Sequence, residues 1–173
     1  CSILEQRNKF PEMCNFVDTE ISQALSFDAT GSQDTSSAYL TAFGADGFSL
    51  GNSVTVNKNT ITYAAWNWKI GGDSGSSNTN GSINTTSTSV NSDAGISIST
   101  YTGNATSGAT VGHGLSKAPE MIINKCRSTA GNWAVYHAGN TSAPETEYLE
   151  LETNAATADI ENIWNDQAPT SSV

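Results

Sequence analysis

The sequence predicts an all-β protein, an antiparallel β-sandwich or jelly roll, and three observations support this fold class. Ser, Thr, Asn and Gly account for 76 of the 173 residues, while charged residues make up only 14%. This composition favours short strands joined by turns, because Gly and Asn tolerate positive φ and Ser and Thr hydrogen-bond to loop backbone. About nine or ten short strand-like segments alternate with turn residues. No segment has the pattern of a helix of normal length.

The first clear strands are short and apolar. Residues 46–51 are expected to form a turn and a strand, and residues 57–59 the loop of a hairpin into the next strand. In residues 60–69, apolar side chains fall on both faces, with Tyr63 on one and Trp66 on the other. A strand covered on one side only would alternate with polar residues, so this strand is predicted to lie centrally in a sheet with both faces covered.

Residues 71–93 consist mainly of Gly, Ser, Asn and Thr, which is the composition of a linker or a long loop. The whole chain, residues 1–173, is expected to form one β-sandwich region, and this stretch is the candidate for an internal boundary. An alternative is a polar edge strand with wide loops, because residues 82–86 and 87–90 include β-branched side chains.

The remaining strands follow this polar stretch. Residues 95–102 alternate with period two, so Ile96 and Ile98 are expected to point inward from a strand with a polar outer face. Further strands are predicted at residues 121–126, 132–137 and 148–152. Residues 155–164 are expected to hold at most one or two helical turns.

The front of the chain resembles its back. Residues 1–7 align with residues 121–127 at an offset of 120, and residues 25–28 align with residues 149–152 at an offset of 124. A polar spacer follows in both copies, and then an aromatic and an aliphatic residue side by side. Self-similarity at a fixed period indicates repeated supersecondary units. We therefore expect the chain to be a fragment of a longer repeat protein.

The net charge and the lengths of the apolar runs argue against nucleic acid and membrane as partners. The net charge is −10, with seven Lys and Arg residues, so a phosphate backbone would be repelled. No apolar run approaches the length that spans a bilayer. The sequence therefore predicts no nucleic-acid binding and no membrane insertion.

No cofactor or metal site is predicted. Cys1, Cys14 and Cys126 form no C-x-x-C pair, and we expect them to be small buried thiols. A calcium site is the one alternative, because jelly-roll lectins often bind calcium with loop carboxylates. No calcium-binding motif in the sequence supports it. The aspartates expected in loops do not have the regular spacing of a calcium-binding loop. They are Asp73, Asp93, Asp159 and Asp166.

The sequence also predicts that the chain is not an enzyme. It has two histidines, of which His113 is expected to be a turn residue bonded to nearby backbone and His137 to end a strand. Neither a G-x-S-x-G elbow nor an H-x-x-x-H spacing is present. The carboxylates are scattered, whereas a glycosidase needs two of them facing each other.

Aromatic residues give the candidate ligand site. The tryptophans are Trp66, Trp68, Trp133 and Trp164. Core packing is their ordinary role, but an exposed ring would also offer a stacking platform for a sugar. We expect ligand contacts first at Trp133, Tyr136 and His137, where two aromatic rings precede a histidine.

Seven segments carry a family resemblance, with the sequences DGFSLG, TYAAWNWK, YTGN, VGHGL, AP, NWAVYH and WNDQAPTSSV. In these segments the chain resembles repeat modules of tail-fibre and virion structural proteins of marine bacteriophages, including cyanophages. The resemblance covers most of residues 40–173, whereas residues 9–14 depart from the pattern. It implies a sandwich similar to concanavalin A-like lectin domains, displayed on the surface of a virion, with no catalytic motif to transfer.

These observations favour a structural virion module of a phage tail fibre or surface appendage, with host glycan or receptor binding as a further role. The expected partners are other copies or modules of the same structure, in a homo-oligomer, together with host surface glycans. The alternative is a cell-surface adhesin or a polysaccharide-active enzyme on a lectin-like sandwich.

Overall fold

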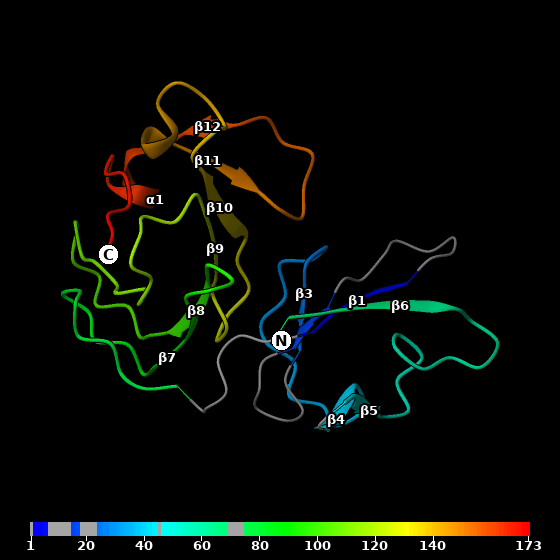
Figure 1. Ribbon diagram of the computed structural model, residues 1–173. Helices are drawn as coiled ribbons and strands as arrows, with labels where there is room; N and C mark the ends of the chain where they lie inside the picture. The colour runs from blue at the N-terminus through cyan, green and yellow to red at the C-terminus, as the bar shows by residue number, and fades with distance from the viewer. Residues whose placement is uncertain (1, 7–14, 18–23, 45, 69–74) are drawn as a thin grey trace. The chain divides into compact units, whose positions relative to one another are not determined.

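The computed structural model describes residues 2–6, 15–17, 24–44, 46–68 and 75–173 (Figure 1). These residues form an almost entirely antiparallel β fold, which confirms the predicted all-β class. The described helices are the 3₁₀ turn η1 (Pro144–Thr146) and the single turn α1 (Glu161–Trp164). The helical turn expected within residues 155–164 is therefore confirmed.

One four-stranded sheet has the strand order β3-β2-β1-β6. Its members are β1 (Ser2–Gln6), β2 (Asn15–Val17), β3 (Leu25–Ser26) and β6 (Tyr63–Asn67). All neighbours pair antiparallel, and in the β1–β6 pair Ile3 lies opposite Trp66.

The predicted central position of residues 60–69 is wrong. Strand β6 lies at the edge of its sheet, with β1 as its only hydrogen-bonded neighbour among the described strands. Four of its five residues are exposed, and Trp66 keeps 40% of its surface open to solvent. Apolar residues on both faces indicated burial, but two of them are alanines, whose small side chains bury little apolar area when covered.

A short hairpin joins β4 (Leu40–Phe43) and β5 (Phe48–Leu50), with Gly44 N–H donating to the carbonyl of Gly47 at 2.7 Å. The strand expected after the turn at residues 46–51 is thus confirmed. The hairpin expected around residues 57–59 is wrong, because β5 pairs with β4 whereas β6 pairs with β1.

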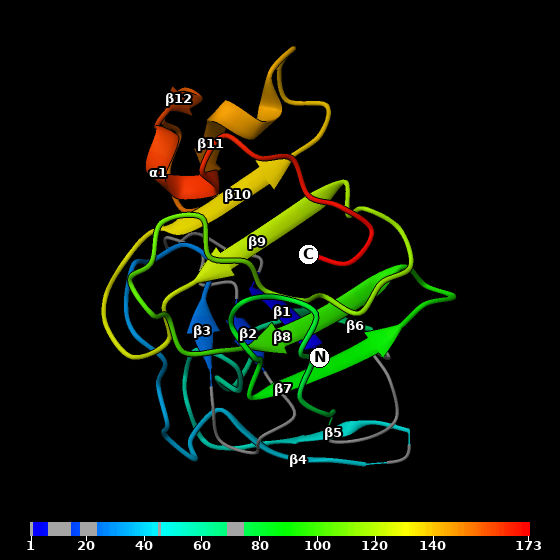
Figure 2. The ribbon, with the colours of Figure 1, turned by 90° about the vertical axis from the view of Figure 1, so that its left-hand side faces the viewer.

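The second four-stranded sheet has the order β12-β11-β10-β9. It contains β9 (Met121–Lys125), β10 (Trp133–His137), β11 (Glu147–Glu150) and β12 (Ala158–Asp159). Figure 2 shows β9 and β10 side by side. The three strands predicted between residues 121 and 152 are confirmed to within two residues at each end.

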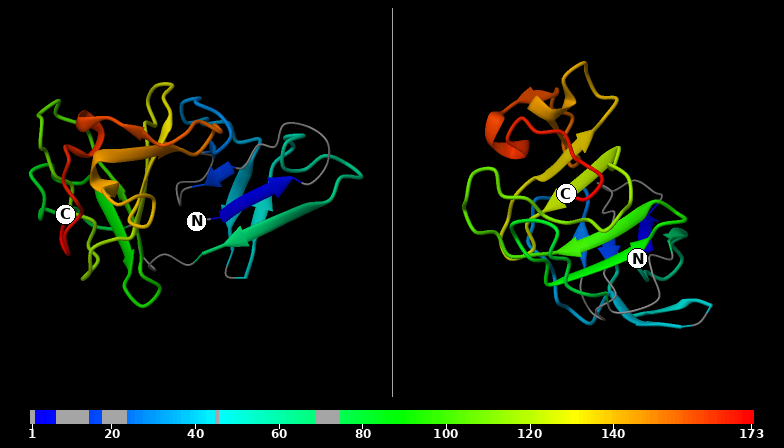
Figure 3. Two further views of the ribbon diagram at one scale, coloured as in Figure 1. Left: turned by 90° about the horizontal axis from the view of Figure 1, so that it is seen from above. Right: turned by 60° about the vertical axis from the view of Figure 1, so that its left-hand side comes forward.

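A separate hairpin joins β7 (Ser87–Asn91) and β8 (Ile96–Thr100), seen as two green arrows in the right-hand view of Figure 3. Strand β7 belongs to the polar stretch 71–93, so the alternative of a polar strand is correct for this part. All five residues of β8 are half-buried, including Ile96 and Ile98.

The chain divides into two compact units. Unit 1 contains Cys1–Trp68, Asn124–Trp133 and Glu150–Asn154, and unit 2 contains Lys69–Ile123, Ala134–Leu149 and Ala155–Val173. The first division therefore falls between Trp68 and Lys69, directly before the stretch that was predicted as an internal boundary.

The two parts of the chain that align in sequence have the same order of neighbouring strands. In the first copy, β1, β2 and β3 are consecutive hydrogen-bonded neighbours, and in the second copy β9, β10 and β11 are as well. The aligned segments 1–7 and 121–127 correspond to β1 and β9. The segments 25–28 and 149–152 include β3 and the end of β11. The two aligned parts thus share a strand order, and the internal repeat stays a prediction.

Candidate functional site

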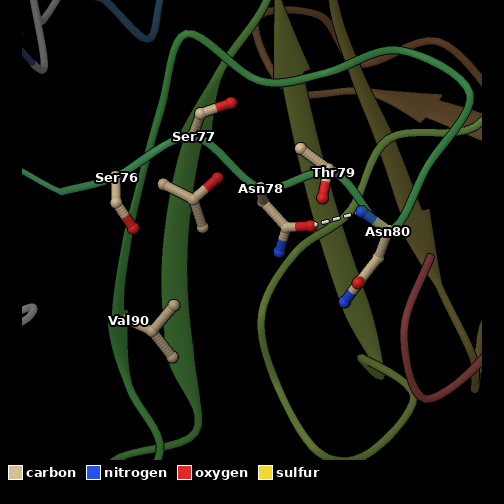
Figure 4. A pocket seen from close by; sticks show the side chains of 7 residues that line it. Ser76, Ser77, Asn78, Thr79, Asn80 and Val90 are labelled. Atoms are coloured by element: carbon tan, nitrogen blue, oxygen red, sulfur yellow. Dashed lines mark hydrogen bonds between the residues drawn. The ribbon is translucent and has the colours of Figure 1, made fainter.

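A polar hollow beside β7 is the first candidate site. It has a volume of about 270 Å³ and lies entirely within unit 2. Figure 4 shows its lining, which is Ser76, Ser77, Asn78, Thr79, Asn80, Thr88 and Val90. None of these side chains is charged. We call this site the β7 hollow.

The loop that forms one wall of the β7 hollow is fixed to β7 by backbone hydrogen bonds. Ser76 N–H donates to the carbonyl of Thr88 at 3.1 Å, and Thr88 N–H donates to the carbonyl of Ser76 at 2.7 Å. Thr88 and Val90 are two residues apart on β7, so their side chains point to the same face. That face forms the other wall.

Asn78 fixes the rest of the loop. Its backbone N–H donates to Thr85 Oγ1 at 2.7 Å, and its carbonyl accepts from Thr85 N–H at 3.0 Å. Its side-chain Oδ1 accepts from Asn80 N–H at 2.9 Å, a local bond that stabilises a turn (Figure 4). The positions of Thr79 and Asn80 are therefore set by the loop itself.

A chain of buried hydroxyl groups runs behind the β7 hollow. Thr85 and Thr88 are 3% and 7% exposed, and their Oγ1 atoms are 2.9 Å apart. Thr88 Oγ1 is also 2.9 Å from Ser99 Oγ, which donates to the carbonyl of Gly112 at 3.2 Å. Because the Ser99 proton is used on Gly112, the chain runs in one direction, from Thr85 through Thr88 to Ser99. Each buried hydroxyl therefore has a partner, as a stable interior requires.

The Gly112-His113-Gly114 segment packs against this region. A Cβ on Gly112 would collide with the Asn78 side chain, and a Cβ on Gly114 would lie 2.6 Å from Val90 Cγ2. Gly114 also has φ of +74°, which favours glycine. His113 Nδ1 accepts from Leu115 N–H at 3.0 Å, so its Nε2 donates to the carbonyl of Thr170 at 3.2 Å. The predicted bonding of His113 to nearby backbone is confirmed by Leu115, although no turn is assigned at His113 itself.

Trp133, the first residue of the predicted ligand site, belongs to the core. It is 3% exposed, and its ring packs against Phe27 with 4.5 Å between centroids. Its Nε1–H lies within hydrogen-bonding distance of the carbonyls of Ser26 and Ala29, at 2.9 and 3.2 Å. The indole therefore presents no open face for a sugar ring.

The other two predicted ligand residues, Tyr136 and His137, differ in their exposure to solvent. Tyr136 is 5% exposed and meets Trp164 edge-on, with 6.2 Å between ring centroids. Burial, together with the nearby charge of Glu145, raises the pKa of its hydroxyl. His137 is exposed, and its Nδ1 accepts from Gly139 N–H at 3.1 Å. Of the three residues, His137 alone is open to solvent, and its contact with a ligand stays a prediction.

The expectation that the cysteines are buried is wrong for Cys126. This thiol is exposed and forms no disulfide with a described residue. Hydrogen bonds from Thr129 and Ser128 lower its pKa to about 7. It follows β9 directly and so lies beyond the strand that was expected to bury it. Cys1 and Cys14 lie outside the described residues.

Within the described ranges, no three His, Cys, Asp or Glu side chains gather closely enough to hold a metal ion. Asp73, one of the aspartates considered for calcium, lies outside these ranges. Among the same residues, no helix has the length and apolar character needed to cross a membrane.

Comparison with known protein families gives a match over most of the chain. A family model described as a domain of unknown function (DUF7483) matches residues 13–173. No curated protein and no solved structure shows a significant similarity to the chain.

Proposed function

The chain belongs to the DUF7483 family of domains of unknown function, and we propose that it is a structural module of a bacteriophage tail fibre or a similar surface appendage. The observation that supports this proposal is the strand order shared by the two aligned parts of the chain, β1-β2-β3 and β9-β10-β11. Repeated β units are suited to serial assembly, because each one presents an equivalent surface to the next. The sequence resemblance to virion repeat modules supports the same role.

In this proposal the sheets pack as a β-sandwich or jelly roll of the concanavalin A-like type. The module acts without catalysis, on the surface of a virion and in contact with other copies of itself. The hydrogen bonds of the two histidines fit a structural role. His113 links its loop to the carbonyl of Thr170, and His137 accepts a hydrogen bond from the turn that follows it.

Immunogold electron microscopy tests this role. Antibodies raised against the chain are expected to label a fibre or appendage on purified particles of the phage that encodes it. Label confined to a cell surface would support the adhesin alternative instead. Particles that carry no label at all would contradict the proposal.

Glycan binding is a second candidate function, and the β7 hollow is the observation that favours it. Hydroxyl and amide groups both donate and accept hydrogen bonds, as sugar hydroxyl groups require. Val90 adds an apolar contact for the C–H groups of a sugar ring. The lining carries no charge, and the chain as a whole carries −10, which disfavours an anionic ligand. We therefore propose a neutral glycan as the ligand.

A double variant tests the glycan site. Thr79 and Asn80 are exposed, so Thr79→Ala with Asn80→Ala is expected to leave the fold intact. Loss of two hydrogen-bonding side chains is expected to weaken binding of a glycan identified on an array by about tenfold. The matched control is Thr102→Ala, an exposed residue of the same unit outside the hollow. Equal affinity of both variants and the wild type would exclude the β7 hollow as the site.

A further inference from the structure

Two exposed tryptophans lie on and directly after strand β6. Trp66 is the fourth residue of the strand, and Trp68 follows its last residue, Asn67. Each of the two tryptophans keeps 40% of its surface open to solvent. Side chains two residues apart on an extended chain point to the same face and begin about 7 Å apart. The two indole rings therefore form a short row along one face, which we call the tryptophan row.

This pair differs from the other two tryptophans of the chain. Trp133 is 3% exposed and packs on Phe27, and the ring of Trp164 meets that of Tyr136. By contrast, Trp66 Nε1–H has no hydrogen-bond partner in the part of the chain that the structure describes. An indole combines an apolar face with a polar N–H, so an exposed one suits a ligand that offers both kinds of group.

The area of the tryptophan row limits the kind of partner that fits it. A tryptophan offers at most about 250 Å², so 40% exposure leaves roughly 100 Å² on each ring and roughly 200 Å² on the row. A specific protein interface buries about 800 Å² on each partner. Val54, the most exposed apolar residue described, does not extend the row. Its carbonyl accepts from Tyr63 Oη at 3.1 Å, and Tyr63 points to the opposite face of β6.

We propose that the tryptophan row binds a neutral oligosaccharide, with one pyranose ring stacked on each indole. The C–H groups on one side of a pyranose ring form a flat apolar face, which packs on the electron-rich face of an aromatic ring. The hydroxyl groups at the rim of the sugar accept a hydrogen bond from Trp66 Nε1–H. Because the row follows an extended strand, it favours an extended chain, such as a β-1,4-linked glucan, over a coiled chain or a single sugar.

Charge and rigidity support this ligand. Strand β6 has the sequence YAAWN, without a charged residue, so it provides no countercharge for an anionic sugar. A tryptophan side chain has only two rotatable bonds, so little conformational entropy is lost when a ligand covers it. The tryptophan row belongs to unit 1, whereas the β7 hollow belongs to unit 2. The row is therefore a second glycan site, and it does not depend on the hollow.

Isothermal titration calorimetry with cellohexaose, a β-1,4-linked glucan, tests the proposal. We expect saturable binding to the full chain, and we expect Trp66→Ala to weaken it about five- to tenfold, because one stacked ring is lost. Trp66→Phe keeps an aromatic face and is expected to lose less affinity. Phe43→Ala is the matched control, since Phe43 is an aromatic residue of the same unit, is 37% exposed and lies in the β4–β5 hairpin.

Circular dichroism checks that each variant is folded, and Trp68→Ala replaces Trp66→Ala if the latter fails to fold. Absent binding of cellohexaose to the wild type, or equal binding to the tryptophan variant and the wild type, would overturn the proposal. Equal affinity for maltohexaose, whose chain is coiled, would contradict the preference for an extended chain.

The variants of the two glycan sites distinguish one site from the other. Thr79→Ala with Asn80→Ala is expected to leave cellohexaose binding unchanged, because both residues line the β7 hollow. Loss of binding in this double variant alone would assign the glucan to the hollow and overturn the tryptophan row. Loss in the tryptophan variant alone would support the row, whatever the result for the hollow.

Discussion

Replacing Trp133 by Ala is expected to lower the free energy of unfolding by about 3–5 kcal/mol, as for other large buried aromatic residues. The indole is 3% exposed and packs on Phe27, so its removal leaves a cavity in unit 1. The substitution also removes the indole N–H that lies beside the carbonyls of Ser26 and Ala29. Urea denaturation followed by circular dichroism measures this loss.

Two variants separate the contributions to this effect. Trp66→Ala makes the same chemical change at a residue that is 40% exposed, and a loss well below that of Trp133→Ala is expected. Trp133→Phe keeps an aromatic ring but leaves the two carbonyls without the indole donor, which is expected to cost about 1–3 kcal/mol. Equal losses for Trp133→Ala and Trp66→Ala would show that Trp133 is not a core residue.

Gly114→Ala is expected to destabilise the protein through two effects that add. The backbone of Gly114 is left-handed, which costs an L-residue about 1–2 kcal/mol. The new Cβ would also lie 2.6 Å from Val90 Cγ2. Relieving this contact is expected to cost about 1–3 kcal/mol more. Because Val90 lines the β7 hollow, the same substitution is expected to change the shape of the hollow. Thermal or urea unfolding measures the total cost.

Gly95→Ala is the matched control for this prediction. Gly95 is also left-handed, with φ of +67°, but a Cβ there would meet no described atom within 4 Å. Only the backbone effect is therefore expected at Gly95. If Gly114→Ala were no more destabilising than Gly95→Ala, the packing of Gly114 against Val90 would be disproved.

Features that depend on neighbouring residues could be predicted from the sequence. The strands β9, β10 and β11 follow local runs of apolar and β-branched residues, and turn residues separate them. The single helical turn α1 was also expected, as was a bond between His113 and nearby backbone, which Leu115 N–H supplies. Each of these predictions required only the properties of a short segment.

Features that depend on distant partners could not be predicted in this way. Strand β6 pairs with β1, which lies far earlier in the chain, so the pattern of β6 alone gave it the wrong place in the sheet. The loop at residues 57–59 was assigned to a hairpin because sequence reasoning favours neighbouring strands as partners. Cys126 was expected to be buried as cysteines often are, but its position after the end of β9 leaves it exposed.

The β7 hollow was not predicted, because its residues lie in a stretch with the composition of a linker. Two signals in the sequence point to order there. Thr85 and Thr88 are β-branched residues in that stretch, and they become the buried hydroxyl pair. Gly112-His113-Gly114 marks a tight approach of the backbone, but its contact with Asn78 and Val90 is visible only in the folded chain.

Cryo-electron microscopy of the labelled appendage tests the central claim, that this chain is one of a series of joined β-modules, most directly. The expected map shows successive copies of the module along the appendage, in contact with one another. A map in which the module occurs singly would contradict the claim.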